Sequence, residues 1–380
     1  MTTGHARRIQ GTQVEMIETG LDLLVFAASA NKSYLTGVPF DRQREGAAPE
    51  LPALFIPARG RPILALDEAT VASAHASWPE QIVVIGVRTA AEALKRAGRA
   101  LEGQVCQIGT GGELSEPLRA ALAAAFPAAG CCSAQSILAG MRRVKDANEI
   151  AALRKAAAVA DAVMAAVVPR IKEGVTQLDL ERELVLQGTQ CGAEAVSFPP
   201  AALFTAANSE VSDDPFTYPK EKGLVAGTTI AFDFGFVVDG YCSDFGRSFH
   251  LGPAPAGVKN ACKALHEAVC GLAALMKPGA LTCGELFPAI ERLLDAAGFG
   301  DYLRARLKDG TLGHQIGLEV HEDPWLKPGS PVPLERGMVM AIEPKLWHAG
   351  QYYLRVEDIV LIGHDKAEFL TTFDRGLFEV

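Results

Sequence analysis

Residues 231–249 read Ala-Phe-Asp-Phe-Gly-Phe-Val-Val-Asp-Gly-Tyr-Cys-Ser-Asp-Phe-Gly-Arg-Ser-Phe, with an Asp-Gly pair at Asp239 and Gly240. The apolar residues on both sides of that pair predict two short strands, Thr228–Val238 and Tyr241–Leu251. Asp-Gly is suited to a tight two-residue turn, so we expect the strands to form an antiparallel hairpin. We take this hairpin as the centre of the fold.

Two aspartates of this hairpin are expected to lie on one face. With a two-residue turn Gly235 faces Asp244, and Asp233 shares that face because side chains alternate along a strand. The two carboxylates are then diagonal neighbours, with Cα atoms roughly 7–8 Å apart. Such a pair either is solvated or binds a cation, and this stretch alone leaves both interpretations open.

A second pair of carboxylates occupies a second candidate hairpin, residues 337–361. Glu343 and Glu357 are equally far from position 350, so a hairpin centred there places them opposite each other. Between the two hairpins, residues 313–324 include His314. Two Asp, two Glu and a His form an oxygen-rich set that can hold two hard or borderline divalent ions.

Length and composition narrow the class of protein. The chain has 380 residues, more than one hydrophobic core usually supports, so two domains are expected. Its 49% apolar content, 21% charged content and net charge of −9 are typical of a soluble globular protein and argue against a nucleic-acid or anionic-membrane partner. The amino terminus lacks a signal-peptide pattern, and no stretch of about 20 apolar residues is found. The eight cysteines form no C-x-x-C motif, which favours reduced thiols in a cytoplasmic protein.

Residues 1–140 alternate apolar runs with Ala-rich stretches, a pattern typical of an α/β domain. The expected strands are Leu21–Ala27, Ala53–Pro57, Pro62–Leu66, Gln81–Val87 and Gln104–Gly109. The expected helices are Glu68–Ala76, Ala90–Leu101 and Glu116–Phe126. We find no catalytic set of residues in this half.

The second half begins with a long Ala-rich helix, expected at Ala147–Val168. It contains a faint internal duplication, because each of two long helices is followed by a helix-capping pair, Thr176/Asp179 and Thr282/Glu285. Two related halves that face each other would place both carboxylate pairs at a shared central cleft.

These segments resemble the creatinase/methionine aminopeptidase superfamily, and most closely its proline-peptidase branch, the Xaa-Pro aminopeptidases and Xaa-Pro dipeptidases (prolidases). The metal ligands of that family occur in the order Asp, Asp, His, Glu, Glu, which corresponds here to Asp233, Asp244, His314, Glu343 and Glu357. The resemblance implies a creatinase-like α/β domain, residues 1–140, and an α+β pita-bread catalytic domain, residues 141–380, with a pseudo-twofold internal duplication. Residues 31–37 also resemble the family's N-x-x-Y-L-T-G segment.

The resemblance implies a role for each ligand. Asp244 and Glu357 would bridge two divalent metal ions, Asp233 would hold one of them, and His314 with Glu343 would hold the other. Glu343 would also carry the proton of the attacking water to the leaving nitrogen. The oxygen-rich set favours manganese, with cobalt, iron or zinc as alternatives.

Two further residues are candidates for catalysis. His321 matches a second family histidine, which donates a hydrogen bond to the substrate or the oxyanion; a structural histidine is the competing interpretation. Arg355 either orients ligand carboxylates or a substrate, or forms an ordinary surface ion pair. The sequence leaves both interpretations of Arg355 open.

The function implied by the resemblance is hydrolysis of X-Pro peptide bonds by a hydroxide shared between the two metal ions. An alternative is a non-peptide C–N hydrolase or lyase on the same scaffold, acting on a small cationic amide or amino-acid derivative. A non-catalytic binding module is a third interpretation, against which the complete ligand set argues. The resemblance also implies a homodimer.

One loop departs from the family pattern. Proline peptidases usually carry a histidine five residues after an asparagine that precedes the first hairpin, whereas the fifth position after Asn208 is Asp213. An ionised aspartate cannot donate a hydrogen bond and would repel a substrate carboxylate. We therefore expect weak activity on simple X-Pro dipeptides and better activity on longer X-Pro peptides or cationic substrates.

Overall fold

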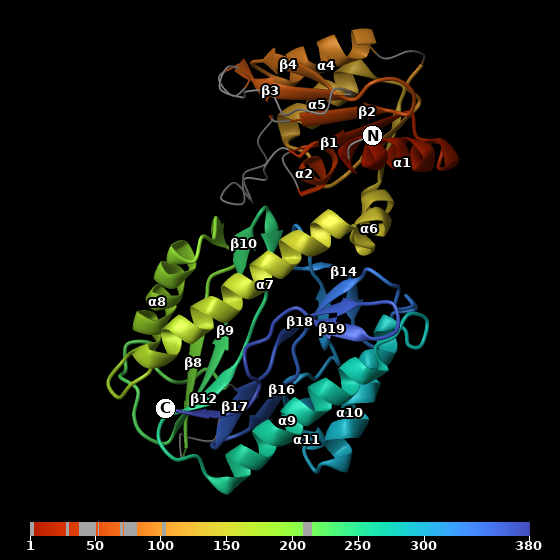
Figure 1. The fold of residues 1–380 in the computed structure, drawn as a ribbon. Helices are drawn as coiled ribbons and strands as arrows, with labels where there is room; N and C mark the ends of the chain where they lie inside the picture. Colours follow the sequence, from red (N-terminus) through yellow and green to blue (C-terminus); the bar gives the residue numbers. More distant parts are fainter. Residues whose placement is uncertain are drawn as a thin grey trace. The chain divides into compact units, whose positions relative to one another are not determined.

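The structure is a computed structural model that describes residues 4–27, 30–37, 51, 53–68, 71, 82–100, 104–207 and 215–380. Contacts divide the chain into two compact units, Met1–Arg142 and Arg143–Val380, both drawn in Figure 1. In the described segments, no helix combines the length and the hydropathy that crossing a membrane requires.

The amino-terminal unit is built on a mixed sheet with the strand order β4-β3-β2-β1-β5-β6. Its strands are β1 (Leu23–Phe26), β2 (Ala53–Pro57), β3 (Ile63–Asp67), β4 (Val83–Val87), β5 (Gln107–Thr110) and β6 (Gly130–Ser133). Its helices include α1 (Gly4–Glu18), α2 (Ala30–Thr36), α4 (Ala90–Ala100), α5 (Glu116–Ala125) and α6 (Gln135–Arg143). Apolar residues of α4 and α5 pack with those of β1, β2 and β3 in one core.

The sequence expectations for this unit are largely confirmed. All five predicted strands are present with slightly different ends, and so are the two predicted helices that became α4 and α5. The predicted helix Glu68–Ala76 lies mostly outside the described residues. Helices α1, α2 and α6 and strand β6 were not predicted.

The carboxy-terminal unit has two halves, each with helices that cover sheets (Figure 1). The first half contains α7 (Ala147–Val167), α8 (Gln177–Gln190), β7 (Ala195–Val196), β8 (Ala201–Ala206), β9 (Thr228–Asp233), β10 (Phe236–Val238), β11 (Tyr241–Cys242) and β12 (Ser248–His250). The second half contains α9 (Ala256–Leu275), α10 (Leu286–Ala296), α11 (Gly300–Arg306), β13 (Gly313–Gln315), β14 (Glu322–Leu326), β15 (Val339–Ile342), β16 (Lys345–His348), β17 (Tyr352–Arg355), β18 (Asp358–Ile362) and β19 (Ala367–Phe369). A last strand, β20 (Phe378–Glu379), returns to pair with β12.

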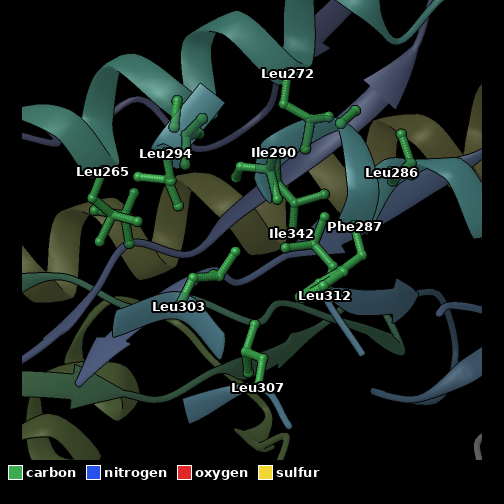
Figure 2. Packing of buried hydrophobic residues seen from close by; sticks show 14 of the residues in the cluster. Leu265, Leu272, Leu286, Phe287, Ile290, Leu294, Leu303, Leu307, Leu312 and Ile342 are labelled. Atoms are coloured by element: carbon green, nitrogen blue, oxygen red, sulfur yellow. The ribbon is translucent and has the colours of Figure 1, made fainter. Parts of the chain in front are cut away.

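Each half has its own hydrophobic core beneath its helices. In the second half, leucines of α9 and α10 interdigitate with apolar residues of the strands, and Figure 2 shows Leu265, Leu272, Ile290 and Ile342 among them. Full burial of side chains of this size stabilises the fold by about 1.5–3 kcal/mol each. Asp233 and His314 lie within strands β9 and β13, and Asp244, Glu343 and Glu357 lie in short segments directly between strands.

The expected duplication has a physical counterpart at the helix starts. The hydroxyl of Thr176 accepts a hydrogen bond from the Asp179 amide, while the Asp179 carboxylate accepts one from the Thr176 amide. Thr282 and Glu285 form the same reciprocal capping box in the other half. Each box follows a long helix, α7 or α9, as the sequence predicted.

The first hairpin has the predicted register. Val238 pairs with Tyr241 across a turn in which Asp239 and Gly240 both have positive φ, 50° and 77°, as an Asp-Gly turn of this type requires. The prediction of two unbroken strands is wrong, because the hairpin is divided between two sheets near Gly235. A Cβ on Gly235 would lie 1.9 Å from the Ser243 carbonyl oxygen, so only glycine permits this close approach.

The second hairpin is also divided, but its register is continuous. Ile342 pairs with Asp358 between β15 and β18, and Lys345 pairs with Arg355 between β16 and β17. Both pairs are symmetric about position 350, so the intervening Glu343 lies across from Glu357 as predicted.

A buried ion pair joins the two halves. Nη2 of Arg247 donates to Oδ1 of Asp358 at 2.7 Å, and both side chains are fully buried. Arg375 donates to the other carboxylate oxygen at 2.7 Å. Burial by itself would raise the pKa of Asp358, but Arg247 and Arg375 hold that pKa below its ordinary value.

We expect Arg247→Met to lower the free energy of unfolding by about 3–5 kcal/mol, because it leaves a buried carboxylate short of a partner. Lys155→Met removes the cation of an exposed ion pair with Asp239. It should lower the free energy of unfolding by at most about 1 kcal/mol. Urea denaturation at pH 7 checks both values. Equal losses in the two variants would contradict the structural role of Arg247.

The same ion pair predicts a pH dependence. The pKa of Asp358 is lowered on folding. Its ion pair therefore stabilises the fold fully above the ordinary carboxyl pKa of about 3.9, and this stabilisation is lost as the pH falls through the pKa of the folded state. The difference in unfolding free energy between the wild type and Asp358→Asn should therefore shrink below about pH 4.

Candidate metal centre

The structure brings all five predicted ligands and His321 together in the carboxy-terminal unit. Their potential ligand atoms form three overlapping groups, and within each group these atoms lie within 4.8 Å of one another. The groups are Asp233–Asp244–Glu357, His314–Glu343–Glu357 and Asp244–His314–His321. Residues far apart in the sequence thus converge where the two halves meet.

Two carboxylate oxygens at the centre have no hydrogen-bond partner among the described residues. They are Oδ1 of Asp244 and Oε1 of Glu357, and both atoms are buried. Burial raises the pKa of Asp244 and of Glu357 well above the ordinary carboxyl range; neighbouring carboxylates add to this rise and Arg355 opposes it. Unpaired buried oxygens beside further carboxylates are where a cation would be most strongly stabilised. The residues present therefore fit divalent metal ions.

His314 is oriented as a metal ligand would be. It lies on β13, the strand between β14 and β15, and its Nδ1 is 3.1 Å from the carbonyl oxygen of Gln315. Because that oxygen can only accept, Nδ1 is the donor of this contact, and Nε2 is the ring nitrogen that faces the carboxylates. Nε2 lies 3.4 Å from Oδ2 of Asp244 and 4.0 Å from Oε1 of Glu343.

Arg355 is at the centre of the carboxylates. Its Nη1 donates to Asp233, and its Nη2 donates to Glu343 at 2.9 Å and to Glu357 at 2.6 Å. Only 4% of Arg355 is exposed, so the interpretation as an ordinary surface ion pair is wrong. Although burial alone would lower it, the surrounding carboxylates raise the pKa of Arg355 well above its ordinary value. The guanidinium therefore stays charged and orients three of the predicted ligands.

Lys345 is a second cation at the centre, and the sequence analysis missed it. Its Nζ donates to Oε2 of Glu343, the same oxygen that Arg355 contacts. Burial by itself would raise the pKa of Glu343, but Lys345 and Arg355 lower it to about 2. The hairpin register would have found this residue, because Lys345 is the cross-strand partner of Arg355.

His321 lies beside the ligand cluster, and two neighbouring rings fix the position of its imidazole. The ring is perpendicular to that of His314, with centroids 4.4 Å apart, and stacked on Trp325 at 5.3 Å. Partial burial, followed by the proximity of His314, lowers the pKa of His321 below its ordinary value. The imidazole is thus neutral near pH 7. His321 as a whole is exposed, as contact with a substrate requires.

A buried ion pair holds the loop that carries His321. Nζ of Lys145 contacts Oε2 of the adjacent residue, Glu322, at 3.2 Å, and the two side chains are only 1% and 5% exposed. The Glu319 amide donates to Oε1 of Glu322 at 3.2 Å. Lys145 was not identified from the sequence, since nothing local in the sequence links it to Glu322.

The loop positions named from the sequence, Asn208 and Asp213, lie outside the described residues. The expectation about dipeptide substrates that rests on Asp213 therefore stays a prediction from the sequence.

Family models match both units. Residues 151–364 match the model of metallopeptidase family M24, and residues 8–144 match that of the creatinase/prolidase amino-terminal domain. The chain belongs to metallopeptidase family M24. The M24 match covers more than half of the chain and includes all the predicted ligands. Enzymes of this family use divalent metal ions, in agreement with the carboxylate and histidine groups seen here.

Curated M24 relatives match the chain over part of their length. A Bacillus subtilis protein named "Putative dipeptidase YkvY" is 32% identical over 249 residues, which are 64% of this chain and 65% of that protein. An uncharacterized peptidase of Staphylococcus aureus is 28% identical over 235 residues, 62% of this chain and 64% of that protein. The chain thus matches just under two thirds of the length of these relatives.

Solved structures show the same fold over the whole chain. The dipeptidase PepE of Mycobacterium ulcerans is 26% identical with a TM-score of 0.81, covering 100% of this chain and 98% of that one. The prolidase of Thermococcus sibiricus is 23% identical with a TM-score of 0.84 over 100% of both chains. The creatinase-like and pita-bread architecture expected from the sequence is confirmed.

Proposed function

We propose that this M24 protein is a metal-dependent hydrolase that cleaves X-Pro peptide bonds. The observation that carries the proposal is the pair of unpartnered, buried oxygens on Asp244 and Glu357 within a cluster of four carboxylates and His314. The family match and the resemblance to prolidase structures support the same conclusion. We assign the activity to residues 141–380, which contain the whole cluster.

In this proposal two divalent ions occupy the overlapping groups. Asp244 and Glu357 would serve both ions, Asp233 would hold one of them, and His314 with Glu343 would hold the other. The oxygen-rich set favours manganese. The bound ions would lower the pKa of a coordinated water and polarise the scissile carbonyl. Arg355 orients Asp233, Glu343 and Glu357 by donating hydrogen bonds to all three.

The remaining roles fall to groups of the chain itself. His321, neutral and exposed, donates a hydrogen bond to the substrate carbonyl or the developing oxyanion. Glu343 is the proposed proton carrier, and its Oε1 is the oxygen that faces His314. A carboxylate with a pKa of about 2 is a weak proton acceptor, so this role requires the Lys345 ammonium to move away from Oε2.

A substrate panel tests the proposal. We expect manganese-loaded protein to hydrolyse X-Pro bonds, with longer X-Pro peptides turned over faster than Ala-Pro or Gly-Pro. The panel includes N-substituted small amides, the substrates of the alternative function. Turnover of those amides together with inert X-Pro peptides would contradict peptide hydrolysis and favour the non-peptide C–N hydrolase. The homodimer expected from the family resemblance stays a prediction.

A further inference from the structure

Two arginines at the end of α11 have opposite surroundings. Arg304 donates hydrogen bonds of 2.7–3.2 Å to three carboxylates, those of Glu291, Asp295 and Asp301. Arg306, the last residue of the helix, has no carboxylate within ion-pair distance among the described residues. Its Nε is buried and has no hydrogen-bond partner in that part of the chain. The Arg306 guanidinium is thus a cation for which the described residues supply no counter-ion.

Two aromatic rings hold this guanidinium in place. The Cζ of Arg306 lies 5.3 Å from the ring centroid of Phe216 and 5.8 Å from that of Tyr353. The two rings are in edge contact with each other, and their centroids are 5.5 Å apart. Aromatic faces attract a cation, and a guanidinium that is already held loses less freedom when it binds a ligand. Phe216 is 42% exposed and Arg306 is half-buried, so a dissolved ligand can reach this cluster.

The cluster lies next to the candidate metal centre. Tyr353 precedes Arg355 by two residues on β17, so their side chains share one face at a spacing of roughly 6–7 Å. Ala231 and Asp233 have the same spacing on β9. Ala231 packs with Tyr353, while Asp233 binds Arg355. One of the rings that hold Arg306 is therefore a single strand repeat away from a predicted metal ligand.

The chemistry of the guanidinium indicates what it binds. Its fork of N–H donors matches the two oxygens of a carboxylate, and its charge repels an ammonium group. An X-Pro peptide has two kinds of carboxylate outside the reacting bond. One is the acidic side chain of the residue before proline, and the other is the carboxy terminus of the peptide.

We propose that Arg306 binds a carboxylate of the substrate, so that the enzyme favours X-Pro peptides that carry a negative charge. Arg306 is then a specificity-determining residue and takes no part in cleaving the bond. The rings of Phe216 and Tyr353 hold its guanidinium in position for this contact. This inference rests on the proposed function, since it presupposes hydrolysis of X-Pro peptides.

The tripeptides Glu-Pro-Gly and Gln-Pro-Gly, each as the free acid and as the carboxy-terminal amide, test the inference with manganese-loaded protein. Exchange of Glu for Gln measures the side-chain carboxylate, and amidation measures the terminal one. We expect one of these two changes to lower the wild-type kcat/KM by about 10–100-fold, mainly through KM, which is the scale of hydrogen bonds to charged groups. Arg306→Met should remove that difference and leave kcat/KM for the Gln-Pro-Gly amide within about threefold of the wild-type value.

Three further variants make the test specific. Arg306→Lys keeps the positive charge and should retain part of the preference for the charged peptide. Arg306→Gln removes the charge and keeps a polar side chain, so it repeats the test if the Met variant is unstable to heat. Arg304→Met removes the same charge from the same helix, where the side chain contacts carboxylates of the protein, and should leave the preference unchanged.

The outcomes separate this inference from the proposed function. Equal kcat/KM values for all four peptides in the wild type would overturn the role of Arg306 and leave X-Pro hydrolysis in place. A preference that persists in both Arg306→Met and Arg306→Gln would do the same, because another group would then bind the carboxylate. Absence of turnover with all four peptides would overturn the proposed function itself, and the inference with it.

Discussion

Asp244→Ala is expected to abolish tight metal binding, reducing the metal content from about two divalent ions per chain to well below one. Asp244 belongs to two of the three ligand groups, so its loss removes a carboxylate from both metal positions. Elemental analysis after removal of free metal measures the effect. Full metal occupancy in the variant would contradict the assignment of this residue and of the centre built on it.

A matched pair of substitutions controls this experiment. Asp244→Asn and Asp239→Asn each replace one carboxyl group of the same hairpin with an amide, but Asp239 is exposed in the turn and pairs with Lys155. Asn also tolerates the positive φ at position 239. Only Asp244→Asn should lose metal. Both variants should unfold at the same temperature as the wild type in the metal-free state, because an ionised Asp244 is disfavoured there by its burial.

His321→Ala is expected to reduce turnover by about 10²–10⁴-fold while the metal content stays at the wild-type level. The ring is held between His314 and Trp325, so its position is fixed before a substrate binds. Because His321 also falls within one potential ligand group, the metal content must be measured on the same sample. That measurement separates a hydrogen-bond donor from a ligand.

Two results would contradict the proposed role of His321. Wild-type turnover in a metal-replete variant would make it a structural residue, and loss of one ion would make it a ligand. His364→Ala is the control, since this exposed histidine contacts the side chain of Asp365, next to it in the sequence and away from the ligand cluster. It should leave both turnover and metal content unchanged.

Much of this centre follows from local sequence rules. The Asp-Gly pair specifies a turn with two positive φ values, and this turn sets which residues face each other along the first hairpin. The same symmetry about position 350 placed Glu343 across from Glu357. Registers of this kind are predictable because a shift of one residue would move every apolar side chain to the wrong face.

Other features could not be predicted, because they depend on partners distant in the sequence. Whether Arg355 contacts water or three carboxylates depends on Asp233, which lies 122 positions away. The support of the His321 loop depends on Lys145, 177 positions before Glu322. No local spacing encodes such contacts, and only the packing of the two halves creates them.

The sequence by itself therefore determined which residues form the centre and on which strand faces they lie, because turn chemistry and strand alternation act over a few residues. The tertiary structure alone decided the charge balance among them. Coulomb energies depend on separations of a few ångströms and on exclusion of water, and both arise only when the halves pack. That packing leaves Asp244 and Glu357 with unpaired oxygens and brings Lys345 against Glu343.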